Sequence, residues 1–219
     1  MITVEDLQHD SEISVYLSRS TEYLGNIGFT EHGKRHATLV SKWAYQVLKS
    51  LDYAERDCQL AEMAGYLHDL ANMINRFNHG GSGALMAFQI LSRMKMEPEE
   101  IALVISAIGN HEEESGSVVN HVAAALILAD KSDVHRSRVT NKDFAKFEIH
   151  DRVNYAAEKS TLVVNKEHKT VTLDITINTE ICPVMEYFEI FLARMIMCRR
   201  AAEFLKCYFS IVINENRLL

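Results

Sequence analysis

The sequence is poor in the residues that interrupt helices. It holds only 2 prolines and 9 glycines among 219 residues, and this scarcity favours long helices over many turns. The apolar fraction of 47% and the charged fraction of 24% are typical of a soluble globular protein. The length suits one domain of ordinary size, or one domain with an appendage, and is sufficient to bury a substantial core.

Long apolar runs are also missing. The longest, "VAAALILA", is far shorter than the roughly 20 residues that a membrane-spanning helix needs. The opening residues, "MITVEDLQHD", contain no basic stretch followed by an apolar one, so we expect no signal peptide. The four cysteines form no CxxC pair. Together these features predict a cytoplasmic protein with reduced thiols and no membrane partner.

Positive charge is in deficit as well. Lysine and arginine total 23 against 30 aspartates and glutamates, which gives a net charge of −7. This balance argues against a nucleic-acid polymer or an anionic membrane as the main partner. A small anionic substrate is compatible with it, provided that the binding site supplies local positive charge.

The first two thirds of the chain has a helical pattern. From Thr3 to Met94 the apolar residues mostly recur at intervals of three and four, and Thr3 with Asp6 forms a candidate capping box. Further helices are predicted from a cap at Thr30 to Ser50, over residues 55–71, after a cap at Ser82, from Pro98 to His111, and over residues 117–136.

The pattern changes after about Arg152. Val171, Leu173, Ile175 and Ile177 alternate strictly with polar residues, which predicts a β-hairpin. Pro183 opens a long helix, and "YFSIVIN" at 208–214 is a candidate third strand. We therefore predict a mainly α protein with a helical domain over residues 1–152 and a small α+β appendage over residues 153–219. Because an isolated hairpin is marginally stable, the sheet should pack on the last helix.

Six residues of metal-ligand type follow one another along the helical part. In order they are His36, His68, Asp69, His79, His111 and Asp130. Imidazole and carboxylate ligands suit iron, manganese, zinc or nickel. A single buried histidine is more often a hydrogen-bonded core residue, but Asp130 follows an apolar run and is costly to bury unless it is paired or bound to a metal. The adjacent His68 and Asp69 can both serve at a helix end, and an aspartate with two oxygens can bridge two ions.

The surroundings of these residues resemble a known family. The segments are "HGKRHATLV", "GYLHDLAN", "NHGGSGA", "AIGNHEE" and "ILADKSD", and their order resembles the HD-domain superfamily of metal-dependent phosphohydrolases. The resemblance runs from Thr30 to Asp133. It departs from many binuclear members at Asn72, where they have a lysine. Asn110 stands where the HD-GYP subgroup has a second histidine, and the GYP motif is absent, so cyclic-di-GMP hydrolysis is not expected.

The resemblance implies an HD-type helical bundle with two divalent transition metal ions, iron or manganese first, with zinc, nickel and magnesium as further options. It assigns His36, His68, Asp69 and Asp130 to one ion and His79 and His111 to the other, with Asp69 as the bridge. The implied activity is hydrolysis of a phosphoester or phosphoanhydride of a small molecule, such as a nucleotide, by a hydroxide shared between the ions.

Candidates for the remaining catalytic groups lie beside the ligands. Lys131 is the best cationic group for the substrate, and Arg136 and Arg138 follow it; the alternative is a solvated basic face balanced by Asp133. His32 lies four residues before His36, which would place both on one helix face. The position resembles that of the general acid in cyclic-nucleotide phosphodiesterases. The alternative is that His32 caps or packs near the helix start.

Two other function classes remain open. Inositol oxygenase uses a similar six-residue pattern, so a di-iron oxygenase is one alternative, which oxygen uptake would reveal. Some HD-related domains are non-catalytic signalling modules after losing ligands, but this sequence keeps all six ligand types. The appendage is expected to be structural, and a homodimer formed through its remaining surface is a further expectation.

Overall fold

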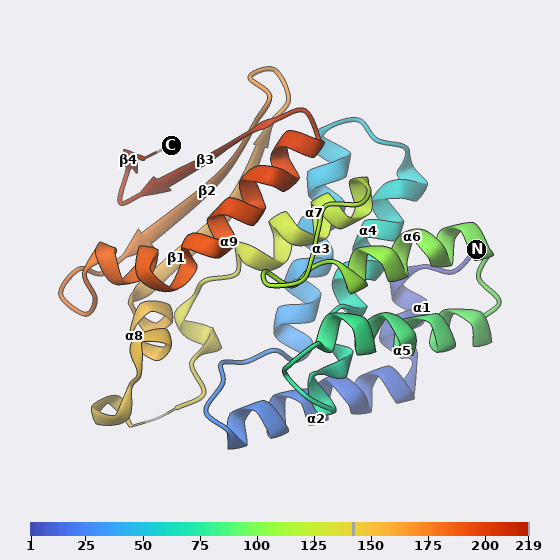
Figure 1. The fold of residues 1–219 in the computed structure, drawn as a ribbon, viewed down its shortest axis with the longest axis horizontal. Helices are drawn as coiled ribbons and strands as arrows, with labels where there is room; N and C mark the ends of the chain where they lie inside the picture. The colour runs from blue at the N-terminus through green and yellow to red at the C-terminus, as the bar shows by residue number, and fades with distance from the viewer. Residues whose placement is uncertain (142, 219) are drawn as a thin grey trace.

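The computed structural model describes residues 1–141 and 143–218, and most of them lie in helices (Figure 1). The α-helices are α1 (Val4–His9), α2 (Ser11–Asn26), α3 (Lys34–Ser50), α4 (Glu55–Leu67), α5 (His79–Arg93), α6 (Pro98–Gly109), α7 (His121–Lys131), α8 (Ile149–Ala156) and α9 (Val184–Phe204). Short 3-10 helices are η1 (Leu70–Met73), η2 (Arg136–Arg138) and η3 (Phe144–Lys146). The strands are β1 (Ala157–Asn165), β2 (Thr170–Ile177), β3 (Tyr208–Ile213) and β4 (Asn216–Arg217). The predicted class, mainly α with a small C-terminal α+β part, is confirmed.

Some predicted helix starts are confirmed and others are wrong. The Thr3 backbone N–H donates to Asp6 Oδ2 at 2.8 Å in the predicted capping box, and Pro98 is the first residue of α6. Thr30 and Ser82, however, are not caps. Helix α3 begins at Lys34, and α5 begins at His79.

The early start of α5 has a local cause. Asn78, directly before α5, has φ 55°, a left-handed conformation that asparagine tolerates better than most residues. The chain therefore turns into α5 three residues before Ser82. Helix α7 ends at Lys131 instead of continuing to residue 136. The 3-10 helix η2 follows after a short break.

Helix α7 forms the centre of the helical part. Every residue from Val122 to Lys131 is buried, and α3, α4, α6 and α9 all pack against this helix. Helices α3 and α4 also pack closely on each other. A Cβ added at Gly65 would lie only 2.8 Å from backbone atoms of Ser41, so the glycine allows the two helices to approach.

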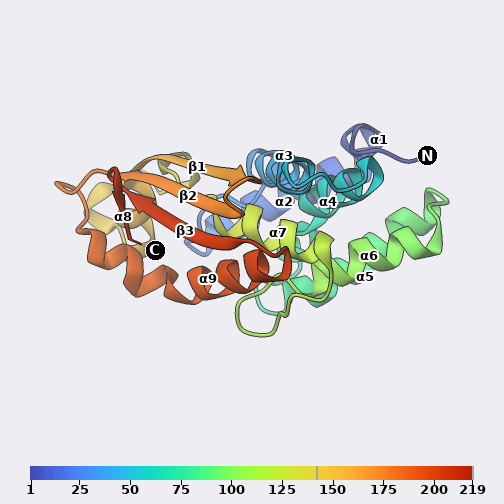
Figure 2. The same ribbon diagram turned by 90° about the horizontal axis from the view of Figure 1, so that it is seen from above.

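The four strands form one sheet in the order β1-β2-β3-β4 at the end of the molecule opposite the N-terminus (Figures 1 and 2). Strands β1 and β2 make the predicted antiparallel hairpin, with Leu162 opposite Leu173. The predicted third strand is also present. It pairs with β2 in parallel, Leu173 opposite Ile211, and α9 provides the crossover that a parallel pair requires.

Helix α9 joins the sheet to the helical part. It lies along one face of the sheet (Figure 2) and packs against both β3 and α7. The alternating residues Val171, Leu173, Ile175 and Ile177 are all buried. One hydrophobic cluster includes residues from α1 to β3. Residue 152, where the sequence pattern changes, lies inside α8.

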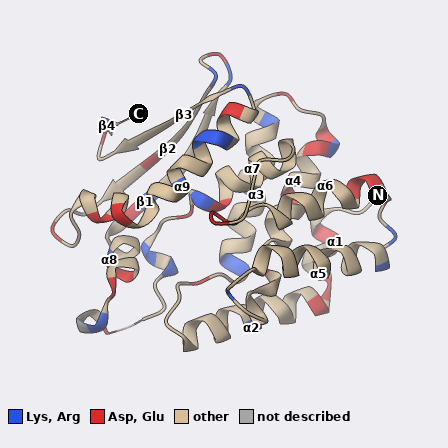
Figure 3. Cartoon of the chain, in the orientation of Figure 1, with Lys and Arg blue, Asp and Glu red and all other residues tan. Residues whose placement is uncertain are grey.

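Acidic and basic residues are interspersed along the helices and loops (Figure 3). Among the described residues, no helix is both long enough and apolar enough to cross a membrane.

Candidate metal centre

The six candidate ligands converge on one buried point. They come from the ends of five helices that are separated in sequence: the start of α3 and α5, the segments that follow α4 and α6, and the last turn of α7. The residues are His36, His68, Asp69, His79, His111 and Asp130, and each is at most 8% exposed. His68 is the residue that ends α4, and Asp69 lies in the turn before η1. This is the helix-end geometry expected for two adjacent ligands.

One group of four donor atoms surrounds a common space. His36 Nε2 lies 3.2 Å from His68 Nε2, 3.2 Å from Asp130 Oδ1 and 3.5 Å from Asp69 Oδ2. His68 Nε2 in turn lies 3.3 Å from Asp69 Oδ2 and 3.6 Å from Asp130 Oδ1. Two imidazole nitrogens and two carboxylate oxygens therefore face one another.

A second group lies on the other side of Asp69. His79 Nε2 is 3.1 Å from His111 Nε2 and 3.2 Å from Asp69 Oδ1, and the distance from His111 Nε2 to the same oxygen is 3.9 Å. Asp69 thus directs one carboxylate oxygen to each histidine pair. The sequence interpretation gave this residue the bridging position.

The remaining ring nitrogen of each histidine is held by an acceptor. His68 Nδ1 donates to Gly65 O at 2.8 Å, and His111 Nδ1 donates to Ile108 O at 2.6 Å. His36 Nδ1 lies 2.7 Å from Asp133 Oδ2. His79 Nδ1 donates to the Arg76 carbonyl at 2.8 Å. Because these acceptors fix hydrogens on Nδ1, each Nε2 presents a lone pair, as in metal-binding histidines.

This donor set fits divalent cations. Facing Nε2 lone pairs at 3.1 and 3.2 Å repel unless a positive charge lies between them. Asp69 Oδ2 is buried without a hydrogen-bond partner among the residues that the structure describes, and a buried carboxylate oxygen without a donor is strongly unfavourable. A cation in each group would satisfy both requirements.

The pKa values of the buried groups also reflect the need for positive charge in the centre. Burial alone would raise the pKa of Asp69 and Asp130, but His68 lowers the first, and Lys131 with the histidines lowers the second, well below the usual range. Burial opposes a charge on His68 too, yet Asp69 and Asp130 raise its pKa to about 10. Burial and then the positive neighbours His68 and Lys131 lower the pKa of His111 to about 3. The two carboxylates thus favour positive charge at this point of the site.

Residues around the ligands fix their orientation. Asp133 is 1% exposed and also accepts from Arg35 Nη2 at 2.7 Å, so it holds the His36 ring; the sequence interpretation had given it only the role of a counter-charge. Lys131 Nζ lies 2.7 Å from Asp130 Oδ2 and 3.2 Å from Glu113 Oε2. It therefore holds the carboxylate oxygen of Asp130 that does not face the histidines.

The two arginines proposed for the substrate have different positions. Arg136 is half-buried and lines no part of the cavity beside His32, and its Nη2 donates to Glu158 at 2.8 Å, so the structure does not bring it to the centre. Arg138 is buried, and its guanidinium donates to the carbonyl of Asp133 at 2.7 Å and to that of Glu31 at 3.2 Å. Arg138 borders the centre, but its guanidinium N–H groups already donate hydrogen bonds to these backbone carbonyls.

A cavity of about 290 Å³ lies beside the centre and is lined by His32, Arg76 and Arg138 together with residues of α8 and α9. His32 precedes α3 and does not share a helix face with His36, contrary to expectation. Its Nδ1 donates to Thr30 O at 2.6 Å, and its ring centroid lies 5.5 Å from that of His36.

Arg76 was missed by the sequence interpretation. Its Nη1 lies 3.3 Å from His79 Nε2 and 3.9 Å from Asp69 Oδ1. It occupies the side of the second histidine pair that faces the cavity. The only signal in the sequence was an arginine three residues before His79.

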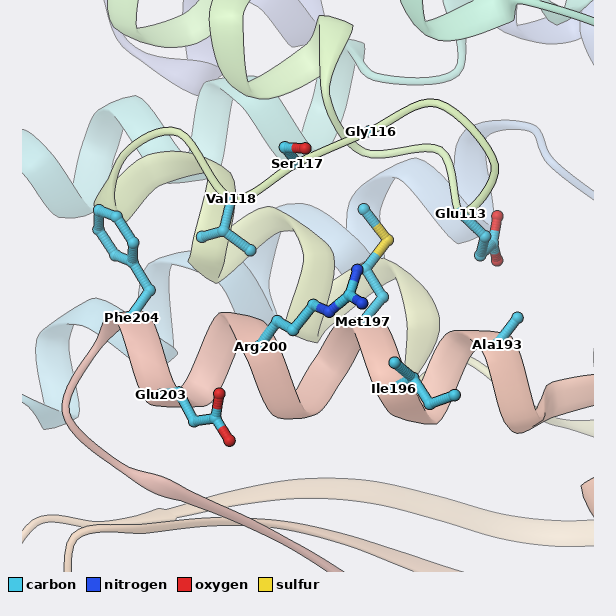
Figure 4. Close-up of a pocket in the computed structure, with 10 residues that line it drawn as sticks. All are labelled: Glu113, Gly116, Ser117, Val118, Ala193, Ile196, Met197, Arg200, Glu203 and Phe204. Carbon is cyan, nitrogen blue, oxygen red and sulfur yellow. The ribbon is translucent and has the colours of Figure 1, made fainter.

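A larger hollow of about 520 Å³ lies between α9 and the loop before α7 (Figure 4). Figure 4 shows Arg200 and Met197 projecting from α9 towards the loop that carries Ser117 and Val118. The six candidate ligands line neither this hollow nor the cavity beside His32. Arg76, however, lines the cavity beside His32 and lies 3.3 Å from His79 Nε2, whereas Glu113 connects the larger hollow to the centre only through Lys131. The cavity beside His32 is therefore the better candidate active site.

Comparisons with known proteins reveal distant relatives. No family model matches the chain. An uncharacterized protein of Methanocaldococcus jannaschii is 24% identical over 200 residues, which cover 80% of this chain and 76% of that protein. A solved structure of a predicted HD superfamily hydrolase from an uncultured Thermotogales bacterium is 22% identical, with a TM-score of 0.45 over 61% of this chain and 75% of that one. The order of the six candidate ligands along the sequence is the feature in which the chain resembles the HD superfamily.

Proposed function

We propose that the protein is a divalent-metal-dependent phosphohydrolase that cleaves a phosphoester or phosphoanhydride of a small molecule. The observation that carries this proposal is Asp69, which presents one carboxylate oxygen to each of two histidine pairs. Two donor groups that share one carboxylate are the arrangement a two-metal hydrolytic site needs.

The residues of the chain divide into two ligand sets. His36, His68, Asp69 and Asp130 would hold one ion, and His79 and His111 would hold the other with Asp69 shared. Ions held there supply Lewis acidity and positive charge for attack on a phosphorus centre. A donor set of imidazole and carboxylate without thiolate suits iron or manganese.

Arg76 is the candidate phosphate-binding residue. Its Nη1 is directed to the histidine pair and is also held by Asn72 Oδ1 at 3.1 Å. A guanidinium binds phosphate oxygens with two parallel hydrogen bonds. We therefore assign phosphate binding to Arg76 and give Lys131 the role of a positioning residue for Asp130.

His32 is the candidate proton donor for the leaving oxygen. Its Nδ1 is occupied by the Thr30 carbonyl, so Nε2 is the atom that can exchange a proton with a ligand in the cavity. Burial, and then the charge of Arg138, lower its pKa well below the usual value. A bound dianionic phosphate acts in the opposite direction, because a nearby negative charge favours the protonated imidazole.

The test is a metal analysis of protein purified without added metal, followed by reconstitution with single divalent metals and a screen for phosphate release. We expect close to two metal equivalents per chain and release of phosphate from small esters. Saturation at one equivalent contradicts the two-ion arrangement. Dioxygen uptake without phosphate release identifies a di-iron oxygenase instead.

A further inference from the structure

The far wall of the cavity beside the metal centre comes from the C-terminal segment. His150, Asp151 and Asn154 of α8 and Phe191 and Arg194 of α9 all line it. All of these residues lie beyond Asp133, where the family resemblance ends. They lie either within the appendage, which the sequence interpretation considered structural, or directly before it. A substrate whose phosphate reached the centre would place its leaving group against this wall.

Arg194 is held in a fixed position on the wall. Its Nε lies 3.0 Å from Glu113 Oε1, and its guanidinium carbon lies 4.4 Å from the ring centroid of Phe191. Its terminal nitrogens make no hydrogen bond to the residues in 1–141 and 143–218 that the structure describes. A guanidinium anchored through Nε and a ring face leaves two N–H groups free to bind a carboxylate in the bidentate mode.

Hydrogen-bond acceptors lie on the same wall. Asn154 is 4% exposed; its Nδ2 donates to His150 O at 2.9 Å, whereas its buried Oδ1 has no partner in the described part of the chain. Asp151 is 6% exposed, and Asn141 approaches its Oδ2 only at 3.5 Å. Buried acceptors are normally satisfied. Asn154 Oδ1 is fully buried and is not reached from the cavity, whereas Asp151 also lines the cavity and can accept a further hydrogen bond there.

We propose that the cavity binds the phosphate ester of a small carboxylic acid that also carries an amino or hydroxyl group. This proposal rests on the proposed phosphohydrolase function. Arg76 binds the phosphate, Arg194 binds the carboxylate, and Asp151 accepts hydrogen bonds from the amine or hydroxyl. The volume of about 290 Å³ is at the lower end for ligand pockets, which are about 300–1,000 Å³. This small volume implies a compact leaving group.

The first experiment compares O-phosphoserine with O-phosphoethanolamine, which differ only by the carboxylate. We expect the metal-loaded protein to favour O-phosphoserine in kcat/KM by about tenfold or more, because hydrogen bonds to charged groups are strong. In Arg194→Gln the ratio should fall close to one, and Arg194→Lys should restore part of it. Arg199→Gln is the matched control on the same helix, outside the cavity, and it should keep the ratio of the unmodified protein.

The second experiment measures binding without turnover. Metal-free protein is titrated calorimetrically with the same two esters, and we expect tighter binding of O-phosphoserine that Arg194→Gln abolishes. Equal affinities for the two esters would overturn the proposal, whatever the turnover. A binding preference without hydrolysis of any ester, p-nitrophenyl phosphate included, would instead contradict the proposed function alone.

The acceptor side of the wall is tested with O-phosphoethanolamine and ethyl phosphate, which differ by the amine. Asp151→Leu has similar volume without the carboxylate, and it should reduce the preference for the amine in the same titration. An unmodified protein that binds both esters equally would remove Asp151 from the assignment.

Discussion

Asp69 is the residue on which both halves of the candidate centre depend. Its two oxygens face different histidine pairs, and one of them lacks any hydrogen-bond donor among the described residues. The geometry follows from the end of α4 at His68, because the next residue leaves the helix and directs its carboxylate between the pairs. Removal of this side chain therefore affects two sites, whereas removal of a terminal ligand affects one.

The first prediction concerns metal stoichiometry. Asp69→Ala should abolish hydrolysis and lower the metal content more than His79→Ala, which should empty only one position. Elemental analysis of both purified variants provides the measurement. His121→Ala is a suitable control, because that histidine contacts Asp57 at 3.2 Å away from the centre. Full occupancy and turnover in Asp69→Ala would refute the bridging role.

A second prediction separates the two roles considered for Lys131. Its ammonium group contacts Asp130 and Glu113, and its side chain is 5% exposed. Lys131→Met should weaken metal affinity by about 10- to 100-fold, as do other losses of groups that orient ligands, with little change in KM at saturating metal. A raised KM with unchanged metal affinity would show instead that Lys131 contacts the substrate.

His32 gives a third prediction at this scale. If it protonates the leaving oxygen, His32→Ala should slow esters with alkoxide leaving groups by about 10²-fold or more relative to p-nitrophenyl phosphate, whose leaving group needs no proton. Metal content should stay at the level of the unmodified protein. Equal losses on both substrates, or loss of metal, would identify a structural residue or a ligand.

The order and type of the six candidate ligands were readable from the sequence, because each stands in a distinctive local segment. The residues that support these ligands could not be identified from the sequence. Asp133 and Arg76 are single charged residues in polar segments, and only folding shows that one orients His36 and the other faces His79. Lys131 was expected to bind the substrate, whereas in the structure its ammonium group contacts Asp130 and Glu113, which lies in a loop distant in sequence.

At the scale of the element, the approach of α3 to α4 determines whether His36 meets His68. The two histidines lie on different helices, and their Nε2 atoms are 3.2 Å apart. Gly65, one turn before His68, is the point of closest approach, where any side chain would meet the backbone of Ser41. The spacing of the first ligand pair therefore depends on a residue with no side chain.

The fourth prediction follows from this contact. Gly65→Ala should destabilise the protein by about 1–3 kcal/mol, the usual range for overpacking a core, and should weaken metal binding. Thermal unfolding and elemental analysis measure the two effects. Gly25→Ala is the matched control, since an added Cβ there has nothing within 4 Å. Equal stability of the two variants would mean that the helices separate freely at Gly65.

The types of the elements were predictable because periodicities of 3.6 and 2 distinguish helix from strand. Helix starts were less so, since polar residues such as Thr30 and Ser82 have capping chemistry without the required backbone turn. The parallel pairing of β2 with β3 was also beyond the sequence pattern. An alternating strand has the same apolar face in either direction, and only the packing of α9 decides between them.

At the scale of the whole molecule, the C-terminal segment completes the helical core. Helix α9 covers α7, whose residues from Val122 to Lys131 are all buried. Met197, Cys198 and Ala201 are among the buried residues of α9. The apolar cluster continues from the bundle through α9 into the sheet. The resemblance to the HD superfamily ends before this segment, yet the segment closes both the core and the cavity.

The last prediction concerns a chain that ends near Arg152. It would interrupt α8 and remove α9, leaving the apolar surface of α7 without its cover. A large newly exposed apolar surface promotes association, so residues 1–152 should be poorly soluble and should bind an apolar fluorescent dye. The full chain, with α9 in place, should do neither. Size-exclusion chromatography and dye fluorescence provide the measurement. A stable, active monomer of residues 1–152 would show that the C-terminal segment is a separate module, with no part in the core or in the cavity.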